Sequence, residues 1–450
     1  MSIKIKINWD NENVVSESVR IYRADSTFTS SNLPPLLAEI VGDVYEYEDV
    51  TTAEGQTYFY MLSAKVDEQE VFTECFVVTA SNSLWLNTAA FMSEYQQRAA
   101  SYRTLESAAT QSAMGANFGT STEKFNGAAL APNGKIYCPP YNASDILIID
   151  PATQTASRSA MGANFGTSTQ KFNGAALAPN GKIYCPPADN GSVLVIDAST
   201  ETAELKGIIP AAAVSGGYKW CGIIAANDGK LYCIPRNSSY VLIIDPATDT
   251  ASISNFGLNL TDQWKYHGAV LAPNGKIYCV PSHATTILVI DPETQTAYRT
   301  NMGVDLSGTW KWMGGAVGAD GKIYCAPYGS ANILIIDPVT DTAILSNMGT
   351  SLSGGDKWYG LTAGADGKLY GIPDDSTNIL IIDTIAQTAI RATLGADLSG
   401  GDKWNGGILS TSGSIYGVPY YSSKILKITA NQAVLAPSVE YCLSPHINKF

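Results

Sequence analysis

The chain has 450 residues, of which 45% are hydrophobic and 15% charged, and its formal net charge is −13. Because no block of lysine or arginine offsets this acidity, nucleic acid is excluded as a main partner. No run reaches the roughly 18 apolar residues of a membrane helix, and the opening sequence MSIKIKINWD alternates like a strand. We therefore expect neither membrane insertion nor export by a signal peptide, and the glycine-rich, weakly charged composition favours an all-β protein.

Residues 1–82 form the first predicted domain, whose first 80 residues hold 14 Asp and Glu against 5 Lys and Arg. Trp9, the segment IYR at 21–23 and the segment YEDVTTAEGQTYFYMLSA at 47–64 resemble a fibronectin type III domain. Tyr58 stands where that fold often keeps its tyrosine corner. The resemblance implies a β-sandwich that would serve as an adaptor domain.

A short connecting helix is predicted in the linker over residues 83–107. Apolar residues recur there at steps of three and four, so they would share one helical face. Two alternatives stay open: the stripe packs on a neighbouring element, or it pairs with a second copy of the chain in a homo-oligomer. The stripe consists of Trp85, Ala89, Met92, Tyr95, Ala99 and Tyr102.

Residues 108–436 contain a repeat with a period of 46 to 48 residues, marked by the glycine of GKIYC at 134, 181, 229, 275, 321, 367 and 413. Each repeat has four short apolar segments separated by turn sequences such as PNG and DPAT. This pattern predicts a seven-bladed β-propeller of four-stranded blades. Its period and strand order resemble kelch and YVTN-type propellers. Residues 437–450 fall outside the repeat as a C-terminal tail.

Five of the eight cysteines hold one equivalent position in successive repeats. Repeat geometry keeps such positions apart, so we expect buried free thiols in a reducing compartment and no disulfides. No CxxC pair and no phosphate-binding loop occurs, so neither a metal site nor a cofactor is predicted. The five are Cys138, Cys185, Cys233, Cys279 and Cys325.

Every repeat places a lysine, an aromatic residue, a variable residue and a glycine just before its innermost strand. Seven such segments would ring one mouth of the central channel. In a structural interpretation, the aromatic packs between blades and the lysine pairs with an acid. In a ligand interpretation, the ring binds an anionic ligand, with the aromatics against the face of a sugar. The latter assigns to the site Lys124, Lys171, Lys219, Lys265, Lys311, Lys357, Lys403, Trp220, Trp312, Trp358 and Trp404.

A loop of variable sequence follows the recurring proline of each repeat and should emerge on the same face. Binding sites often lie where a fixed framework carries variable residues. Tyrosine, asparagine and arginine in such loops are typical of contact surfaces, although ordinary solvated loops are the alternative. The candidate binding residues in this loop are Tyr141, Arg236, His283, Tyr328 and Tyr420.

His267 and His283 belong to the same repeat and should face the same side, as in propeller lyases that use histidine as a general acid or base. Neither histidine has a carboxylate partner at an informative spacing, and no hydrolase, zinc-protease or calcium-loop motif occurs. The chain is therefore predicted not to be an enzyme. A polysaccharide lyase or hydrolase is the catalytic alternative.

The combination of a small N-terminal adaptor with near-identical repeats resembles bacteriophage virion proteins of the tail or fibre type; SAMGANFGTST occurs at both 112–122 and 159–169. The resemblance implies a non-enzymatic virion component, assembled in the host cytoplasm. Its partners would be other virion proteins, through the N-terminal domain or the tail, and a host-surface glycan or a neighbouring virion subunit, through the propeller. A cytoplasmic interaction scaffold is the second alternative.

Overall fold

The structure is a computed structural model, and the chain divides into two compact units, chiefly residues 1–102 and 103–433. In the first unit it describes residues 3–8, 18–26, 32–41, 46–52, 57–66, 69–72 and 76–79. In the second it describes residues 107–119, 122–213 and 216–430. The predicted connecting helix and the C-terminal tail lie outside these ranges. No helix of the described part could span a bilayer.

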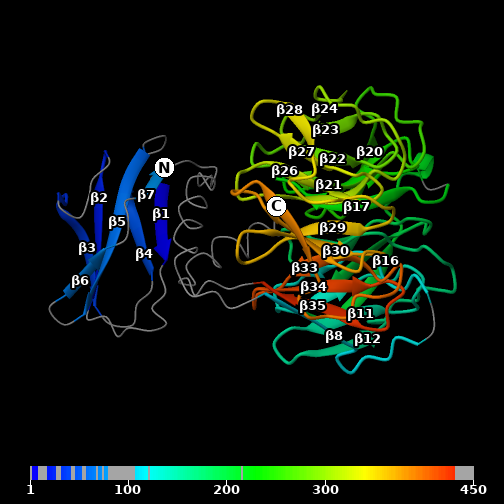
Figure 1. The fold of residues 1–450 in the computed structure, drawn as a ribbon, viewed down its shortest axis with the longest axis horizontal. Coiled ribbons are helices and arrows are strands. Elements are labelled where there is room, and N and C mark those ends of the chain that lie inside the picture. The colour runs from blue at the N-terminus through cyan, green and yellow to red at the C-terminus, as the bar shows by residue number, and fades with distance from the viewer. Residues whose placement is uncertain are drawn as a thin grey trace. The chain divides into compact units, whose positions relative to one another are not determined.

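In the described residues of the first unit, seven strands form two sheets (Figure 1). Strand β1 pairs with β4, while β3, β2, β5 and β6 form the other sheet in that order, with β7 also on β5. Long-range pairing of β2 with β5 joins residues around Ile21 to residues around Leu62. The strands are β1 (Ile3–Asn8), β2 (Ser18–Ala24), β3 (Leu36–Val41), β4 (Glu46–Thr52), β5 (Thr57–Val66), β6 (Gln69–Phe72) and β7 (Phe76–Thr79).

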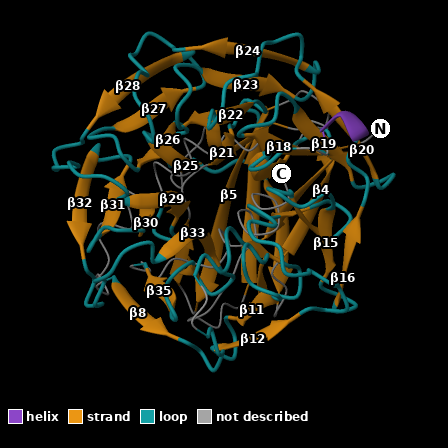
Figure 2. Ribbon diagram, turned by 90° about the vertical axis from the view of Figure 1, so that its right-hand side faces the viewer, coloured by secondary structure: helices purple, strands orange, loops and turns teal. Residues whose placement is uncertain are grey.

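The second unit contains seven four-stranded antiparallel sheets arranged around a ring, which Figure 2 shows nearly end-on. We number them blades 1 to 7 in chain order. Blades 1 to 3 consist of β9 (Ala129–Leu130), β10 (Ile136–Cys138), β11 (Ile146–Asp150) and β12 (Thr155–Ser159); β13 (Ala176–Leu177), β14 (Ile183–Cys185), β15 (Val193–Asp197) and β16 (Thr202–Lys206); and β17 (Trp220–Ala225), β18 (Leu231–Pro235), β19 (Val241–Asp245) and β20 (Thr250–Ser254). A 3-10 turn, η1 (Ala211–Ala213), precedes blade 3.

The remaining blades repeat the pattern, and the prediction of a propeller of four-stranded blades is confirmed. Blades 4 to 6 are β21 (Tyr266–Leu271), β22 (Ile277–Pro281), β23 (Ile287–Asp291) and β24 (Thr296–Thr300); β25 (Trp312–Val317), β26 (Ile323–Pro327), β27 (Ile333–Asp337) and β28 (Thr342–Ser346); and β29 (Trp358–Ala363), β30 (Leu369–Pro373), β31 (Ile379–Asp383) and β32 (Thr388–Ala392). Blade 7 is β33 (Trp404–Leu409), β34 (Ser414–Pro419), β35 (Ile425–Thr429) and β8 (Ala108–Ser112).

Blade 7 is closed by a strand from the other end of the propeller sequence. Strand β8 precedes blade 1 in the chain, yet it pairs antiparallel with β35, from Ile425 opposite Ser112 to Thr429 opposite Ala108. The pairing makes the propeller a closed ring.

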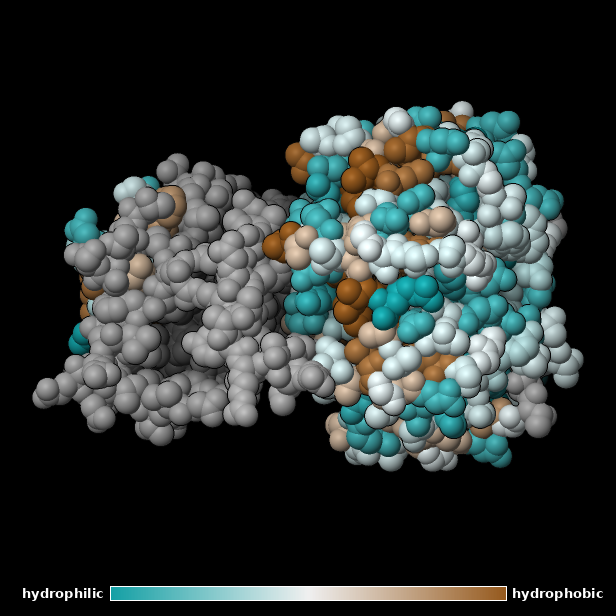
Figure 3. Space-filling model, viewed as in Figure 1, coloured by the Kyte–Doolittle hydropathy of each residue, from teal (hydrophilic) through white to brown (hydrophobic). Residues whose placement is uncertain are grey.

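Burial follows the residue types of each strand. The second and third strands, such as IYCVP in β22 and ILVID in β23, are almost fully buried because their apolar side chains pack between adjacent blades. The outermost strands alternate exposed and partly covered residues. Apolar side chains are scattered over the surface in Figure 3, and Val339, Ile344 and Ile390 are among the most exposed large ones. All described cysteines are free and buried.

The shared glycine of the Lys-aromatic-x-Gly segment lies where the blades approach most closely. A Cβ on Gly127 would lie 2.6 Å from Cα of Gly174, and one on Gly222 would lie 2.9 Å from Cα of Gly268. These glycines also have positive φ, +81° at Gly127 and +89° at Gly222. Only a residue without a side chain fits both constraints.

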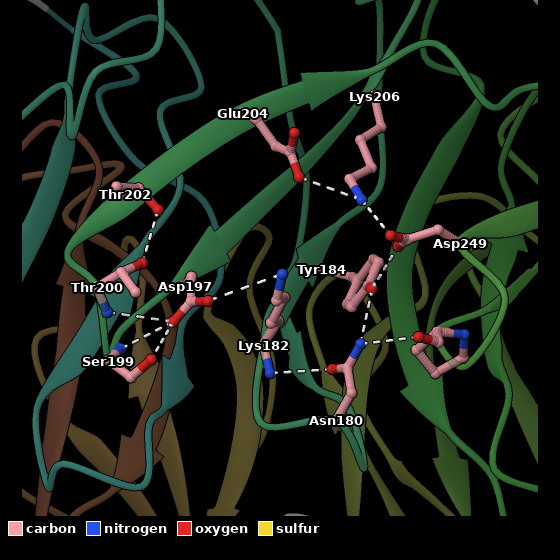
Figure 4. A network of polar contacts seen from close by, with 11 residues as sticks. Asn180, Lys182, Tyr184, Asp197, Ser199, Thr200, Thr202, Glu204, Lys206 and Asp249 are labelled. Carbon is pink, nitrogen blue, oxygen red and sulfur yellow. Dashed lines mark hydrogen bonds and ion pairs between the residues drawn. The ribbon is translucent and has the colours of Figure 1, made fainter.

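On the propeller face opposite the Lys-aromatic-x-Gly segments, a network of hydrogen bonds and ion pairs links neighbouring blades (Figure 4). Asn180 donates from Nδ2 to Tyr184 Oη at 3.0 Å and to the carbonyl of Pro246 in blade 3 at 2.9 Å. Tyr184 in turn donates to Asp249 at 3.1 Å. The recurring aspartate of the turn, Asp197 here, accepts from backbone N–H groups and pairs with Lys182 at 3.7 Å. This aspartate therefore serves the opposite face.

Candidate functional site

The seven lysines of the ring are buried and bind backbone carbonyl groups. Lys311 Nζ donates to the carbonyl oxygens of Ser282 and Gly308, both at 2.8 Å. Lys357 donates to the carbonyls of Tyr328, at 2.7 Å, and Gly354. In each case one acceptor belongs to the variable loop of the preceding blade, so the ammonium group ties two blades together. Carbonyl groups therefore take the place of the acid partners of the structural interpretation. The ammonium groups of Lys265, Lys403 and Lys124 also reach a carbonyl of the preceding blade's loop. Those of Lys171 and Lys219 bind the carbonyl three residues earlier in their own segment, at Ser168 and Gly216.

The tryptophans that follow four of the lysines are buried as well. Trp312 Nε1 donates to the carbonyl of Asn332 at 2.8 Å, within its own blade. Trp220, Trp358 and Trp404 make the equivalent bond, 20 residues along the chain. Their side chains are at most 1% exposed. The structure thus places these four predicted ligand residues between blades.

The variable residue between the aromatic and the glycine reaches the centre of the ring. In blades 3 to 7 a β-bulge falls at this position of the innermost strand, which redirects the side chain. Side chains from blades that are not neighbours then meet: Tyr359 Oη of blade 6 lies 2.6 Å from His267 Nε2 of blade 4 and 3.3 Å from Asn126 Nδ2 of blade 1. We call the whole set the central cluster: Asn126, Asn173, Cys221, His267, Met313, Tyr359 and Asn405.

The central cluster has hydrogen-bonding capacity to spare. Cys221 Sγ lies 3.1 Å from His267 Nε2 and 3.3 Å from Asn173 Oδ1. Among the described residues, however, the buried Nδ2 of Asn173 and the buried Oδ1 of Asn405 have no hydrogen-bond partner. Because an unsatisfied buried polar atom costs free energy, these atoms indicate contacts with water or with a ligand.

Arg236 lies among aromatic residues on one side of the mouth. Its guanidinium carbon is 4.2 Å from the ring centre of Trp264, 5.0 Å from that of Tyr218 and 5.8 Å from that of Trp310. The side chain is 9% exposed, and no carboxylate of the described residues forms an ion pair with it. His283 packs edge-on against Trp310, at 4.5 Å between ring centres. A nearly buried cation without a counter-ion is a site for an anion.

The opposite side of the mouth is acidic. Asp374 of the blade 6 loop is 2% exposed, and burial, followed by the charges of Asp402 and Asp375, raises its pKa to about 8. Tyr328 hydrogen-bonds the Asp374 carboxyl group. Tyr141 and Tyr420 stand nearby with ring centres 6.0 Å apart. The mouth thus has two different sides. One side holds the Arg236 guanidinium among aromatic rings, and the other holds the carboxyl groups of Asp374, Asp375 and Asp402.

The geometry sorts the predicted candidates. Arg236, His283, Tyr141, Tyr328 and Tyr420 do lie at one mouth, whereas the lysines and tryptophans of the ring face blade joints. The residues missed by the sequence analysis stand directly before and after the Lys-aromatic pair. The preceding residue, for example Trp264 or Asp402, has a left-handed backbone in every blade and forms the rim. The residue type varies at both positions, whereas the lysine, the aromatic residue and the glycine around them recur in every repeat. This variation within a constant segment is the signal that could have identified them. A separate cavity of about 600 Å³ between Thr285 and Ser307 shares no residue with this mouth.

Burial lowers the pKa of His267 well below its usual value of 6.5, and the charge of Arg236 lowers it further. Tyr359 shows the converse, since burial raises its pKa well above the usual range. Burial also raises the pKa of Cys221 to about 11. At neutral pH the centre therefore holds a neutral imidazole, a neutral phenol and a neutral thiol, all within reach of one guanidinium.

Acid should destabilise the protein through His267. The unfolded chain takes up a proton at this histidine below about pH 6.5, whereas the folded chain resists it, so stability falls as the pH drops through that window. One group contributes at most about 1.4 kcal/mol per pH unit. Melting temperatures of the native chain and of His267→Asn between pH 8 and pH 5 should converge toward acid. A constant difference across this range would contradict the prediction.

No family model and no curated protein matches the chain. Solved structures do match. A catalytically inactive histidine-to-alanine variant of virginiamycin B lyase from Staphylococcus aureus, with quinupristin, has a TM-score of 0.57 at 13% identity, covering 72% of this chain and 99% of that one. The extracellular domain of a one-component system from B. thetaiotaomicron gives 0.53 at 12% identity, covering 83% and 46%. YCF48 bound to a D1 peptide gives 0.52 at 12%, covering 72% and 97%. These likenesses show the fold, a multi-blade β-propeller.

The prediction of a non-enzymatic bacteriophage virion structural protein was wrong. The solved propellers that match include an enzyme, virginiamycin B lyase. The prediction rested on domain order and on the similarity of the repeats, which describe architecture and carry no chemistry. The predicted partners and the virion location are not tested by these likenesses.

Proposed function

We propose that the propeller is a lyase that acts on an acidic polysaccharide at the channel mouth, with His267 and Tyr359 as its acid–base pair. The single observation that carries this proposal is the 2.6 Å contact between His267 Nε2 and Tyr359 Oη beside the charge of Arg236. The neighbouring lyase structure supports the scaffold only. The fibronectin type III character of the first unit stays a proposal too, supported by the order β3-β2-β5-β6 beside β1-β4.

The proposed step is the β-elimination of a uronic acid residue. Arg236 would pair with the substrate carboxylate, which acidifies the neighbouring C–H bond and stabilises the charge that develops on the carboxylate oxygens. Neutral His267 removes that proton, a carbon–carbon double bond forms, and the glycosidic C–O bond breaks. Tyr359 gives its proton to the departing oxygen. Proton transfer from the imidazolium to the phenolate, along their shared hydrogen bond, then restores both groups.

The geometry specifies the stereochemistry of this reaction. A base and an acid whose reacting atoms are 2.6 Å apart reach the same side of a sugar ring, so the elimination should be syn. Neutral His267 is competent as a base because its pKa is lowered, and Tyr359 keeps its proton because its pKa is raised. The aromatic wall of Tyr218, Trp264 and Trp310 offers faces on which sugar rings can stack.

The test measures the absorbance of the conjugated double bond when the full chain is incubated with polysaccharides of different uronic acids. Tyr359→Phe and His267→Ala should each lower kcat by about 10²–10⁴-fold, since each removes one proton-transfer group. Arg236→Gln should lower the rate and raise KM. The control is Tyr298→Phe on the exposed outer strand β24, which should match the unchanged chain. New reducing ends without the double bond would indicate a hydrolase. No cleavage of any substrate, or full activity in Tyr359→Phe, would refute the proposal.

A further inference from the structure

The acidic side of the mouth brings together three carboxylates from two blades. Asp374 and Asp375 lie in the loop between β30 and β31 of blade 6, and Asp402 precedes β33 of blade 7. One carboxylate oxygen from each lies within 4.8 Å of an oxygen from each of the others. No sequence motif marks this group, because 27 residues separate Asp375 from Asp402.

A second observation distinguishes this group from an ordinary acidic surface. Asp374 is 98% buried, being 2% exposed, and its Oδ1 has no hydrogen-bond partner among the described residues. Its carboxyl group is repelled by the charges of Asp402 and Asp375, and it also has the hydrogen bond from Tyr328 and the charge of Lys403. The ammonium group of Lys403 binds the backbone carbonyl of Asp374 and the carbonyl of Gly400 instead of the carboxylate. This buried carboxyl oxygen therefore lacks the partner that buried polar atoms normally have.

The hydrogen bond that holds the two loops of this site together also occurs in blade 2, where the other two carboxylates are absent. Asp375 Oδ1 accepts from the backbone N–H of Asp402 at 2.7 Å, which fixes the two loops together. Asp189 of blade 2 makes the same bond to the N–H of Tyr218 at 2.6 Å. There, however, alanine and tyrosine stand where blades 6 and 7 have Asp374 and Asp402. The hydrogen bond is therefore structural, and the two additional carboxylates are specific to this place.

We propose that Asp374, Asp375 and Asp402 bind a hard divalent cation of the Ca²⁺ or Mg²⁺ class at the channel mouth. Such ions take oxygen ligands from carboxylates and complete their coordination with water. The site is open to solvent at Asp375 and Asp402, which are both exposed. The bound ion would provide the positive partner that Asp374 Oδ1 lacks and would reduce the repulsion among the three carboxylates.

The experiment uses the full chain freed of metal with a chelator and titrated separately with CaCl₂ and MgCl₂ in a calorimeter. We expect saturable binding of one ion per chain and a higher melting temperature. Tb³⁺ should bind too and give sensitised luminescence, because Tyr328 contacts Asp374. Asp374→Asn and Asp402→Asn should each weaken binding at least tenfold. Asp189→Asn is the matched control, since it alters the same frame position in blade 2, and it should bind normally.

The outcomes are decisive whether or not the protein is a lyase, because the readouts are heat, melting temperature and luminescence. Circular dichroism shows that each variant is folded before titration. Preference for one of the two salts identifies the ion. Absence of heat with both salts, undiminished binding by Asp374→Asn, or equal loss in Asp189→Asn would each overturn the proposal.

Discussion

Replacing Gly127 with alanine should destabilise the propeller by about 2–5 kcal/mol. A Cβ there would lie 2.6 Å from Cα of Gly174, a backbone atom that cannot move aside without displacing blade 2. Forcing the blades apart costs about 1–3 kcal/mol, and the left-handed φ of +81° costs an L-residue about 1–2 kcal/mol more. The melting temperature of the second unit, followed by calorimetry on the full chain, measures the effect.

Gly181→Ala isolates the contribution of the backbone conformation. Gly181 has nearly the same φ, +79°, but a Cβ there would meet nothing within 4 Å. We expect this control to lose only the roughly 1–2 kcal/mol of left-handed strain. If both variants melt at the same temperature, contact between glycines at the axis is not what limits residue choice in the repeated segment.

Lys311→Met should lower the free energy of unfolding by about 1–3 kcal/mol. The substitution removes the charged donor of the Ser282 and Gly308 carbonyls, each 2.8 Å from Nζ. Ser282 still accepts from the backbone N–H of Lys311 at 3.2 Å and Gly308 is exposed to solvent, so the cost is that of lost charge-assisted hydrogen bonds. Part of the loss is offset because the ammonium group is no longer buried; burial lowers the pKa of Lys311 to about 8.

The control for this prediction is Lys322→Met in the same blade. Lys322 Nζ lies 3.9 Å from the Asp337 carboxylate at a partly exposed turn, so its loss should cost about 0–1 kcal/mol. Equal melting temperatures for the two variants would argue against a blade joint. Lost ligand binding by Lys311→Met, with an unchanged melting temperature, would instead favour the ligand interpretation of the ring.

The sequence predicted the blades well because a period of 46 to 48 residues with four apolar segments has one common structural solution. It did not predict β8 as the closing strand, since AATQS lacks the apolar run of the inner strands and buries only Ala109 beside Leu426 and Ile428 of β35. The repeat also predicted which loops share a face, and Arg236, His283 and Tyr328 accordingly lie at the same mouth of the channel.

The chemistry of the mouth was harder to predict, for two physical reasons. The residue after the aromatic is asparagine in three blades and Cys, His, Met or Tyr in the other four. His267 and Tyr359 therefore look unrelated in the sequence, although the ring places His267 Nε2 of blade 4 and Tyr359 Oη of blade 6 2.6 Å apart across the centre. The invariant lysines drew attention because they repeat, but the repetition reflects bonds to backbone carbonyls around each blade joint. Contacts across the centre of the ring have no counterpart in the repeat.

The pairing of β8 with β35 has a consequence for how the chain folds. Ser112 and Ile425 are opposite each other although 313 positions separate them, so this blade can form only after nearly the whole repeat region has been synthesised. An open stack of repeats could gain stability one unit at a time. In a ring that its first strand closes, the last contacts form only when the two ends of the repeat region meet, and this costs the conformational entropy of closing the whole loop. We expect slow, strongly cooperative folding for this unit, with a high contact order setting the rate.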